Sequence, residues 1–244
     1  MDWDAFVARV AWICRLILQA VSGESEGTRL ISVDEKTGIQ APGRKTETSM
    51  GKGADRRIEA EYSRHGTTCL MAAFDVAGGA IMHHRTGPTR KEPDFLCFIQ
   101  QCVEKIPEGD KAIFLLDQLN TRMSESLVIW VAGQLGDAPN LGVKGRKGIL
   151  KDKKTRMAFL EDPRHRIRFV FTPKHCSWLN PVENWFAKLQ THIIKYGNFN
   201  SVGELEARIA KYVGFYNACL AKPLNWTFKG FVKSHQLYGL KLRA

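Results

Sequence analysis

A short, continuously apolar run, "KAIFLLD" at residues 111–117, limits the fold of this chain more than any other segment. Runs of this kind are typical of a strand that is covered on both faces, so the sheet needs helices on each side. A second segment, "TTCLMAAFDVAGGAIMHHR" at residues 67–85, has two apolar runs around Ala77-Gly78-Gly79 and predicts a β-hairpin. Together the two segments predict an α/β fold in which a mixed sheet is flanked by helices.

The remaining elements alternate along the chain and complete a five-stranded sheet. The apolar spacing from Phe95 to Ile106 is helical. The polar residues 40–66, rich in Gly, Lys and Arg, are predicted as a loop. The predicted order is a strand at 28–38, the hairpin, a helix at 95–106, the strand at 111–117, a helix opened by Ser124, a strand at 166–172, a helix from Pro181, and a helix from Ser201 with a Ser-x-x-Glu box.

The N-terminal segment "DWDAFVARVAWICRLILQAVSG" is apolar at helical spacing and predicts an amphipathic helix. Asp4, Arg9 and Arg15 interrupt it, so we expect no segment of membrane-spanning length and no membrane partner. The six cysteines include no CxxC pair, and most lie in apolar runs. We therefore expect reduced, buried thiols, a cytoplasmic protein and no zinc site.

Positive charge is concentrated in one segment of a chain whose net charge is +11. Eleven basic and three acidic residues lie from Leu141 to Lys174, a local net charge of +8. Most charge runs are solvated loops, but a run this one-sided favours a polyanion, and nucleic acid is the leading candidate. The residues predicted to contact DNA are Lys144, Arg146, Lys147, Lys151, Lys153, Lys154, Arg156, Lys174 and His175.

Carboxylates end two of the predicted strands, Asp34 in "ISVD" and Asp117 in "IFLLD". Either one alone is readily explained as a cap or a turn residue. A third acid, Glu183, follows Asn180 and Pro181, a sequence that predicts a helix start with Asn180 as N-cap. Side chains at strand ends converge in α/β sheets, and a few carboxylates are what Mg²⁺ uses in proteins. The three residues are therefore candidates for a metal site, while Glu183 alone is explained by its place in the capped first turn.

Three segments, "SVDEKTGIQA", "FLLDQLNTRMSESLV" and "FTPKHCSWLNPVENWF", resemble the catalytic blocks of mariner-type transposases, specifically their bacterial insertion-sequence relatives in the retroviral-integrase superfamily. Further segments, "GKGADRRIEAEYSRHGTTCLMAAFDV", "LGVKGRKGILKDKKTRMAFLEDPRH" and "YNACLAKPLNWTFKG", are similar to the same family, so the resemblance extends from about residue 30 to about residue 230.

The resemblance implies an RNase H-like fold with a DDE triad of Asp34, Asp117 and Glu183. It also implies two Mg²⁺ or Mn²⁺ ions held by these carboxylates, one activating water or a DNA 3′-hydroxyl and the other stabilising the leaving oxygen. The expected partner is double-stranded DNA, both transposon ends and target. A homodimer is a further candidate partner, and the location implied is the bacterial cytoplasm at the nucleoid.

The chain also departs from the family pattern. Gln118 stands where the family usually has Asn, and Arg122 replaces the histidine of an "NTH" motif. About thirty residues precede Asp34, too few for the helix-turn-helix modules usual in the family, so a companion polypeptide from a split gene is a candidate partner. The expected division is an N-terminal helix at 1–28, left from a linker or upstream region, a catalytic domain at 29–200 with a basic insertion at about 134–165, and a C-terminal helix and tail at 201–244 packed on it.

Two other functions fit the same residues. One is an inactive or repurposed transposase fragment that binds DNA without sequence preference through its basic segment. The other is a host nuclease of the RNase H-like fold. Among the remaining residues, Trp178, Trp185 and Phe186 are predicted to pack in the core and anchor the helix from Pro181, because apolar residues there share one helical face.

Overall fold

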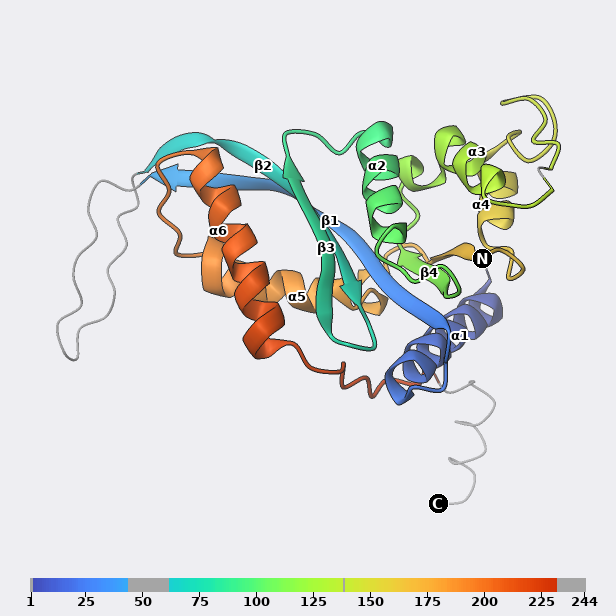
Figure 1. Ribbon diagram of the computed structural model, residues 1–244, viewed down its shortest axis with the longest axis horizontal. Helices are drawn as coiled ribbons and strands as arrows, with labels where there is room; N and C mark the ends of the chain where they lie inside the picture. Colours follow the sequence, from blue (N-terminus) through green and yellow to red (C-terminus); the bar gives the residue numbers. More distant parts are fainter. Residues whose placement is uncertain (1, 44–61, 138, 232–244) are drawn as a thin grey trace, which may run out of the picture.

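The computed structural model describes residues 2–43, 62–137 and 139–231. Its centre is a five-stranded sheet in the order β3-β2-β1-β4-β5 (Figure 1). The strands are β1 (Thr28–Gly43), β2 (Ser63–Asp75), β3 (Ala80–Gly87), β4 (Lys111–Leu116) and β5 (Ile167–Phe171). The pairs β1–β2 and β2–β3 are antiparallel, whereas β1–β4 and β4–β5 are parallel. The predicted mixed sheet of five strands is therefore confirmed.

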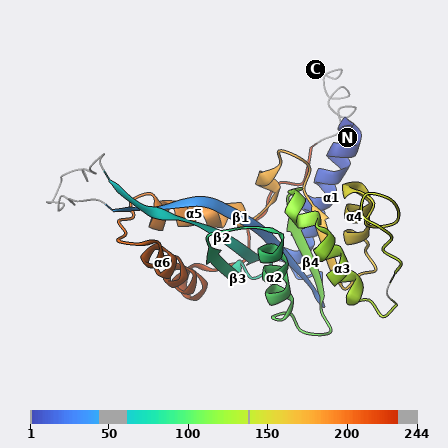
Figure 2. The ribbon, with the colours of Figure 1, turned by 90° about the horizontal axis from the view of Figure 1, so that it is seen from above.

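Helices cover both faces of the sheet. They are α1 (Trp3–Ser22), α2 (Glu92–Val103), α3 (Glu125–Gly133), α4 (Lys153–Leu160), α5 (Val182–Leu189) and α6 (Val202–Phe215). One buried cluster joins α1, α5 and α6 to one face of the sheet, and a second joins α2, α3 and α4 to the other. Beyond β4 and β5, β1 and β2 continue as a long ribbon beside α5 and α6 (Figure 2).

Alternation along the strands assigns each side chain to a face. In β1, Leu30 belongs to the cluster with α5, whereas Ile31 and Val33 belong to the cluster with α2. In β4, Leu115 lies on the α5 side, and Phe114 and Leu116 lie on the α2 side. Apolar residues on both faces explain why "KAIFLLD" has no polar alternation.

The predicted loop at 40–66 is wrong at both ends. β1 continues to Gly43 and β2 begins at Ser63, while residues 44–61 lie outside the described residues. The register of β1 with β2 shifts next to Gly38 and Pro42, so these two residues stand at irregularities within a strand. Ile39 and Ala41, close to these irregularities, are buried in the cluster with α1, α5 and α6, and they hold this part of β1 against the core.

The basic segment contains one helix that was not predicted. α4 begins after Asp152, whose carboxylate accepts a hydrogen bond from the Thr155 N–H at 2.9 Å. Its charged composition suggested a loop, yet Leu160 is completely buried against the second cluster. Met157 and Phe159 also pack against this cluster, so tertiary contacts and a good cap stabilise two turns of helix here.

The expectation that no segment reaches membrane-spanning length is also wrong. By length and composition α1, with 20 residues and a mean hydropathy of 1.5, could cross a membrane. In the structure one face of α1 packs on the sheet, through Val10, Ile13 and Ile17, which are fully buried. All six cysteines are free, and Cys14, Cys102 and Cys176 are buried as expected, whereas Cys219 is exposed.

Candidate active site

The sheet register places Asp34 and Asp117 side by side. The last parallel pair between β1 and β4 is Ser32 with Leu115, and the two aspartates each lie two residues further on. By alternation both point to the face that α5 covers. The prediction that Asp34 ends its strand is wrong, because β1 continues through Asp34 to Gly43. Asp117 does directly follow β4. The candidate site therefore lies at the end of β4 and beside the middle of β1.

Glu183 joins them from the first turn of α5, but Asn180 does not cap this helix as predicted. The Asn180 side chain is buried and donates hydrogen bonds to Val33 O at 3.0 Å and Asp34 Oδ2 at 3.1 Å. The cap comes instead from the sheet, because the Val182 N–H donates to Ser32 Oγ at 2.8 Å. Ser32 Oγ–H in turn donates to Asn180 Oδ1. This buried network fixes the start of α5 relative to Asp34.

Ser32→Ala should therefore destabilise the protein by about 1–2 kcal/mol, because it leaves the Val182 N–H without its acceptor in a buried place. The measurement is the free energy of unfolding in urea. Ser22→Ala is a matched control, since that exposed hydroxyl donates to Gln19 O at the end of α1, and we expect it to change stability by less than about 0.5 kcal/mol. Equal stability of the Ser32→Ala variant and the wild type would contradict the role of this network.

Arg122 lies between the carboxylates, a position that was not predicted. Only 1% of its side chain is exposed, and its Nη2 lies 2.7 Å from Asp34 Oδ1 and also contacts Glu35. Its Nη1 lies 2.6 Å from Asp117 Oδ1. Burial alone would lower the pKa of Arg122, but the charges of Asp34, Glu35 and Asp117 raise the pKa overall, so the guanidinium is charged. The sequence signal for this position was a basic residue, Arg122, in the turn that follows Asp117.

Asp34, which contacts Arg122, also interacts with Glu183. Burial and the charge of Asp34 raise the pKa of Glu183 above its ordinary value, and a hydrogen bond with Asp34 adds to the rise, against Lys36 and Arg122, which lower it. Two carboxyl groups in contact are the oxygen donors that a hard divalent cation takes. Among the described residues, however, no three His, Cys, Asp or Glu side chains form a group that could hold a metal ion. The donor type fits Mg²⁺ or Mn²⁺, and the guanidinium lies between the donors.

The turn after Asp117 is fastened by side chains. Gln118 donates from Nε2 to Thr172 O at 3.0 Å, so its amide connects the ends of β4 and β5. Lys153 donates to Gln118 O at 2.7 Å and to Asn120 Oδ1 at 3.1 Å. A pocket of about 310 Å³ opens beside this turn, lined by Asp117, Gln118, Leu119, Thr172, Pro173, Lys174, His175, Cys176 and Ser177. Two of the predicted DNA contacts thus line a pocket with a predicted catalytic residue.

The other predicted DNA contacts fall into two groups. Lys153 and Arg156 serve the fold, since Arg156 donates to Met123 O at 2.8 Å and to Leu150 O at 3.2 Å. The rest are exposed, and Lys144 forms a surface ion pair with Glu125. These exposed residues are Lys144, Arg146, Lys147, Lys151, Lys154, Lys174 and His175. His175 has a φ of 61°, a left-handed backbone conformation that few residues other than glycine adopt.

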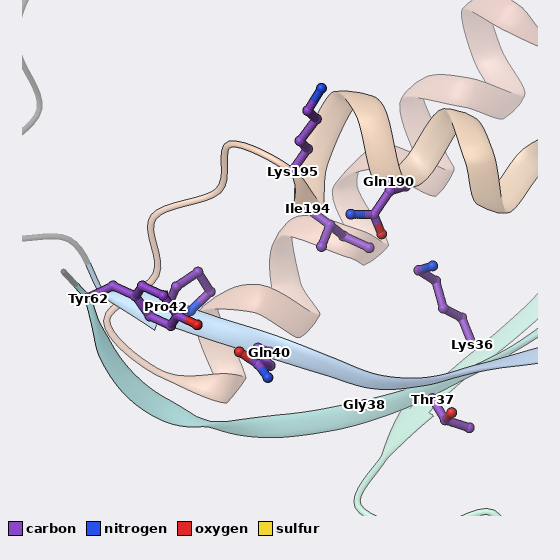
Figure 3. A pocket seen from close by; sticks show the side chains of 9 residues that line it. All are labelled: Lys36, Thr37, Gly38, Gln40, Pro42, Tyr62, Gln190, Ile194 and Lys195. Carbon is purple, nitrogen blue, oxygen red and sulfur yellow. The ribbon is translucent and has the colours of Figure 1, made fainter. Parts of the chain in front are cut away.

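A second hollow runs along β1 beside the end of α5. It has a volume of about 390 Å³ and is lined by Lys36, Thr37, Gly38, Gln40, Pro42, Tyr62, Gln190, Ile194 and Lys195. In Figure 3 the Lys36 side chain rises from the strand on the side where Gln190 lies, whereas Thr37 points the other way. Lys36 is two residues from Asp34, so this polar hollow adjoins the carboxylates on the Glu183 side.

The tryptophans of the Pro181 region behave differently from one another. Trp185 and Phe186 are buried in the cluster with α1 and α6, as predicted. Trp178 is 45% exposed and makes an edge contact with Phe228 at 5.2 Å between ring centroids. The prediction of a core position for Trp178 is therefore wrong, because it lies in a short 3₁₀ turn (Ser177–Leu179) in which Leu179 takes the buried position.

Comparisons with known proteins agree with this geometry. The profile of a family described as "DDE superfamily endonuclease" matches residues 29–206, which is most of the chain. The chain therefore belongs to the DDE superfamily of endonucleases, which confirms the DDE part of the resemblance seen in the three sequence blocks, whereas its bacterial insertion-sequence part stays a prediction. A comparison with curated proteins found no match.

Solved structures of the Mos1 mariner transposase share the fold. The catalytic domain alone matches with a TM-score of 0.51 and 11% identity, over 88% of this chain and 83% of that chain. The catalytic domain with raltegravir and Mg matches at 0.50 and 12%, over 93% and 88%. The paired-end complex with Mn matches at 0.53 and 12%, over 88% of this chain but 56% of that chain. The predicted RNase H-like fold is thus confirmed, and this chain spans little more than half the length of the longer Mos1 chain.

Proposed function

We propose that this chain is the catalytic domain of a DDE transposase that cleaves transposon-end DNA and joins it to target DNA. One observation supports the proposal: Asp34 on β1 lies beside Asp117 after β4, Arg122 contacts both, and Asp34 also meets Glu183 on α5. The carboxyl end of a parallel strand, here β4, is a usual position for a site in an α/β sheet. Family membership and the Mos1 fold give this convergence its chemical meaning.

The three carboxylates would hold Mg²⁺ or Mn²⁺, two ions in the full arrangement. When bound, the ions supply an activated water or 3′-hydroxyl and stabilise the leaving oxygen of the phosphodiester. Asn180 and Ser32 orient Asp34 and the first turn of α5, so they hold two of the donors in place. Crystal structures of Mos1 contain Mg or Mn, which supports the choice of ions.

Double-stranded DNA, both transposon ends and target, is the proposed partner. Mos1 has been solved as a paired-end complex with the left transposon end, which supports this assignment. The exposed basic residues near the pocket, Lys174 and His175, and those of the 144–154 segment are the proposed phosphate contacts. A homodimer, a companion helix-turn-helix polypeptide, and a bacterial cytoplasmic location at the nucleoid complete the proposal.

The test is cleavage of supercoiled plasmid DNA that carries the inverted repeats flanking the source gene. The purified chain should nick this plasmid with Mn²⁺ or Mg²⁺ and should leave it intact with excess EDTA. Any helix-turn-helix polypeptide encoded upstream of the gene is included in a parallel reaction. Absence of nicking with both ions, in both reactions, would contradict the proposal, and nicking that persists in EDTA would contradict the metal requirement.

A DNA-binding fragment without nuclease activity is the second candidate, and the position of Arg122 favours it. A guanidinium that already neutralises Asp34 and Asp117 reduces their need for metal ions. This candidate predicts the same salt-sensitive DNA binding as the first, but no nicking at any Mn²⁺ concentration. The plasmid assay therefore separates the two, whereas a DNA-binding assay does not.

A further inference from the structure

We propose that Arg122 is a built-in counter-ion that competes with divalent cations for Asp34 and Asp117. Metal binding at these carboxylates then requires the guanidinium to leave them. The inference rests on the proposed function for the identity of the metal ligands, but it concerns a residue outside the triad. It predicts that the isolated chain binds metal weakly, and that removal of Arg122 strengthens binding.

The geometry places the guanidinium where it blocks a shared ion. Its Nη2 and Nη1 contact Asp34 and Asp117 at 2.7 and 2.6 Å, so the two aspartates bind the same cationic group. Arg122 contacts Oδ1 of each aspartate, and Asp34 Oδ2 already accepts a hydrogen bond from Asn180, so a cation shared by both aspartates competes with Arg122 for the same pair of carboxylates. With 1% of its side chain exposed, Arg122 has no solvent-facing alternative in this conformation.

Charge makes this competition direct. Four acidic side chains lie here, those of Asp34, Glu35, Asp117 and Glu183. Among the described residues, Arg122 contacts the first three, Arg90 contacts Glu35, and the charge of Lys36 acts on Glu183. Acidic groups therefore outnumber basic groups at this site, and such an excess attracts divalent cations. Because a guanidinium and a metal ion neutralise the same oxygens, each weakens the binding of the other.

The bonding of Arg122 is incomplete. Among the described residues, its Nε and Nη1 have no hydrogen-bond partner, so the close Nη1 contact with Asp117 has the distance of an ion pair without hydrogen-bond geometry. A buried donor without an acceptor costs about 1–3 kcal/mol. Arg122 is therefore held at this position by charge more than by a satisfied hydrogen-bond network, and a stronger cation is able to replace it.

The backbone around Arg122 keeps the side chain aimed at the carboxylates. The residue lies in a short 3₁₀ helix (Asn120–Met123), in which the Arg122 N–H donates to Leu119 O at 3.1 Å. Its neighbour Met123 is fully buried, and the Met123 carbonyl accepts a hydrogen bond from Arg156. The competition is thus a fixed property of the fold, and metal entry has to move the side chain, not the turn.

The test is Mn²⁺ binding to the full chain without DNA, measured by isothermal titration calorimetry. We expect Arg122→Gln to bind Mn²⁺ at least about tenfold more tightly than the wild type, because its carboxylates no longer have a fixed counter-charge. Arg90→Gln is the matched control. It also removes one positive charge that contacts Glu35, but it leaves Asp34 and Asp117 untouched, so its Mn²⁺ affinity should stay within about threefold of the wild type.

Removal of a buried cation can unfold a protein, so a second variant keeps the test decisive. Arg122→Gln combined with Glu35→Gln removes one charge of each sign, and we expect the same gain in Mn²⁺ affinity, together with a larger Mn²⁺-induced rise in Tm than the wild type shows. Equal or weaker Mn²⁺ binding by this double variant would overturn the inference. If the wild type and the double variant bind Mn²⁺ equally and the wild type cleaves DNA, the proposed function stands and the inference fails, whereas absence of both Mn²⁺ binding and plasmid nicking overturns both.

Discussion

Asp117→Asn should lower metal-dependent DNA cleavage by about 10³-fold. The substitution removes one negative ligand from the proposed metal site, and stabilisation of charge by a metal is worth several kcal/mol in the transition state. Asp117 suits the test better than Asp34, because 45% of its side chain is exposed whereas Asp34 is nearly buried. Asparagine also keeps an oxygen for the Leu119 N–H, which donates to Asp117 Oδ1 at 2.9 Å. The fold should therefore survive the change.

The measurement is the rate of plasmid nicking at saturating Mn²⁺, with the free energy of unfolding determined in parallel. Asp110→Asn is the matched control, since Asp110 precedes the same strand at its opposite end and pairs there with Arg29 on the surface. We expect this control to cleave at the wild-type rate within about twofold. Wild-type cleavage by the Asp117→Asn variant would remove Asp117 from the catalytic set.

The sheet could be predicted because its signals are local. The apolar run 111–117 indicates that both faces of β4 are covered, and two glycines after Ala77 predict the hairpin. The pairing of Asp34 with Asp117 needed more, because it depends on the parallel register of β1 and β4. A resemblance to known blocks supplied that pairing, which periodicity alone does not contain.

What could not be predicted depends on contacts between distant segments. Gly38 and Pro42 are turn signals in sequence, and only the pairing of β1 with β2 shows that they lie within a strand. The cap of α5 comes from Ser32, which is separated from it by most of the chain. No local rule could have preferred Ser32 over Asn180, the residue that sequence favours at that position.

Arg122 is the clearest case. In sequence it was only the replacement for a histidine in the family pattern. Asp34 and Asp117 do lie side by side, but the guanidinium contacts both of them. The same substitution thus has two consequences, the loss of an imidazole and the gain of a competing cation, and only the second requires the three-dimensional structure.

Trp185→Ala should destabilise the protein by about 3–5 kcal/mol, the usual cost of removing a fully buried large aromatic side chain. Trp185 is 1% exposed and packs against Phe186, Tyr212 and Tyr216, which join α5 to α6 and its continuation. Because the substitution lies two residues after Glu183, it should also lower DNA cleavage under conditions in which the protein remains folded. The free energy of unfolding is measured in urea by circular dichroism, since the variant loses a fluorophore.

Trp178→Ala separates the loss of an indole ring from the loss of support for α5. This tryptophan belongs to the same sequence block, but it is 45% exposed and its contacts are edge contacts with Phe228 and Phe231. We expect a cost of about 1 kcal/mol or less. Comparable losses of stability in the two variants would mean that α5 is not anchored by Trp185. A large loss of stability in Trp185→Ala but not in Trp178→Ala, with less DNA cleavage than the fraction of folded protein accounts for, would show a second role. The hydrophobic packing of α5 would then also set the position of Glu183.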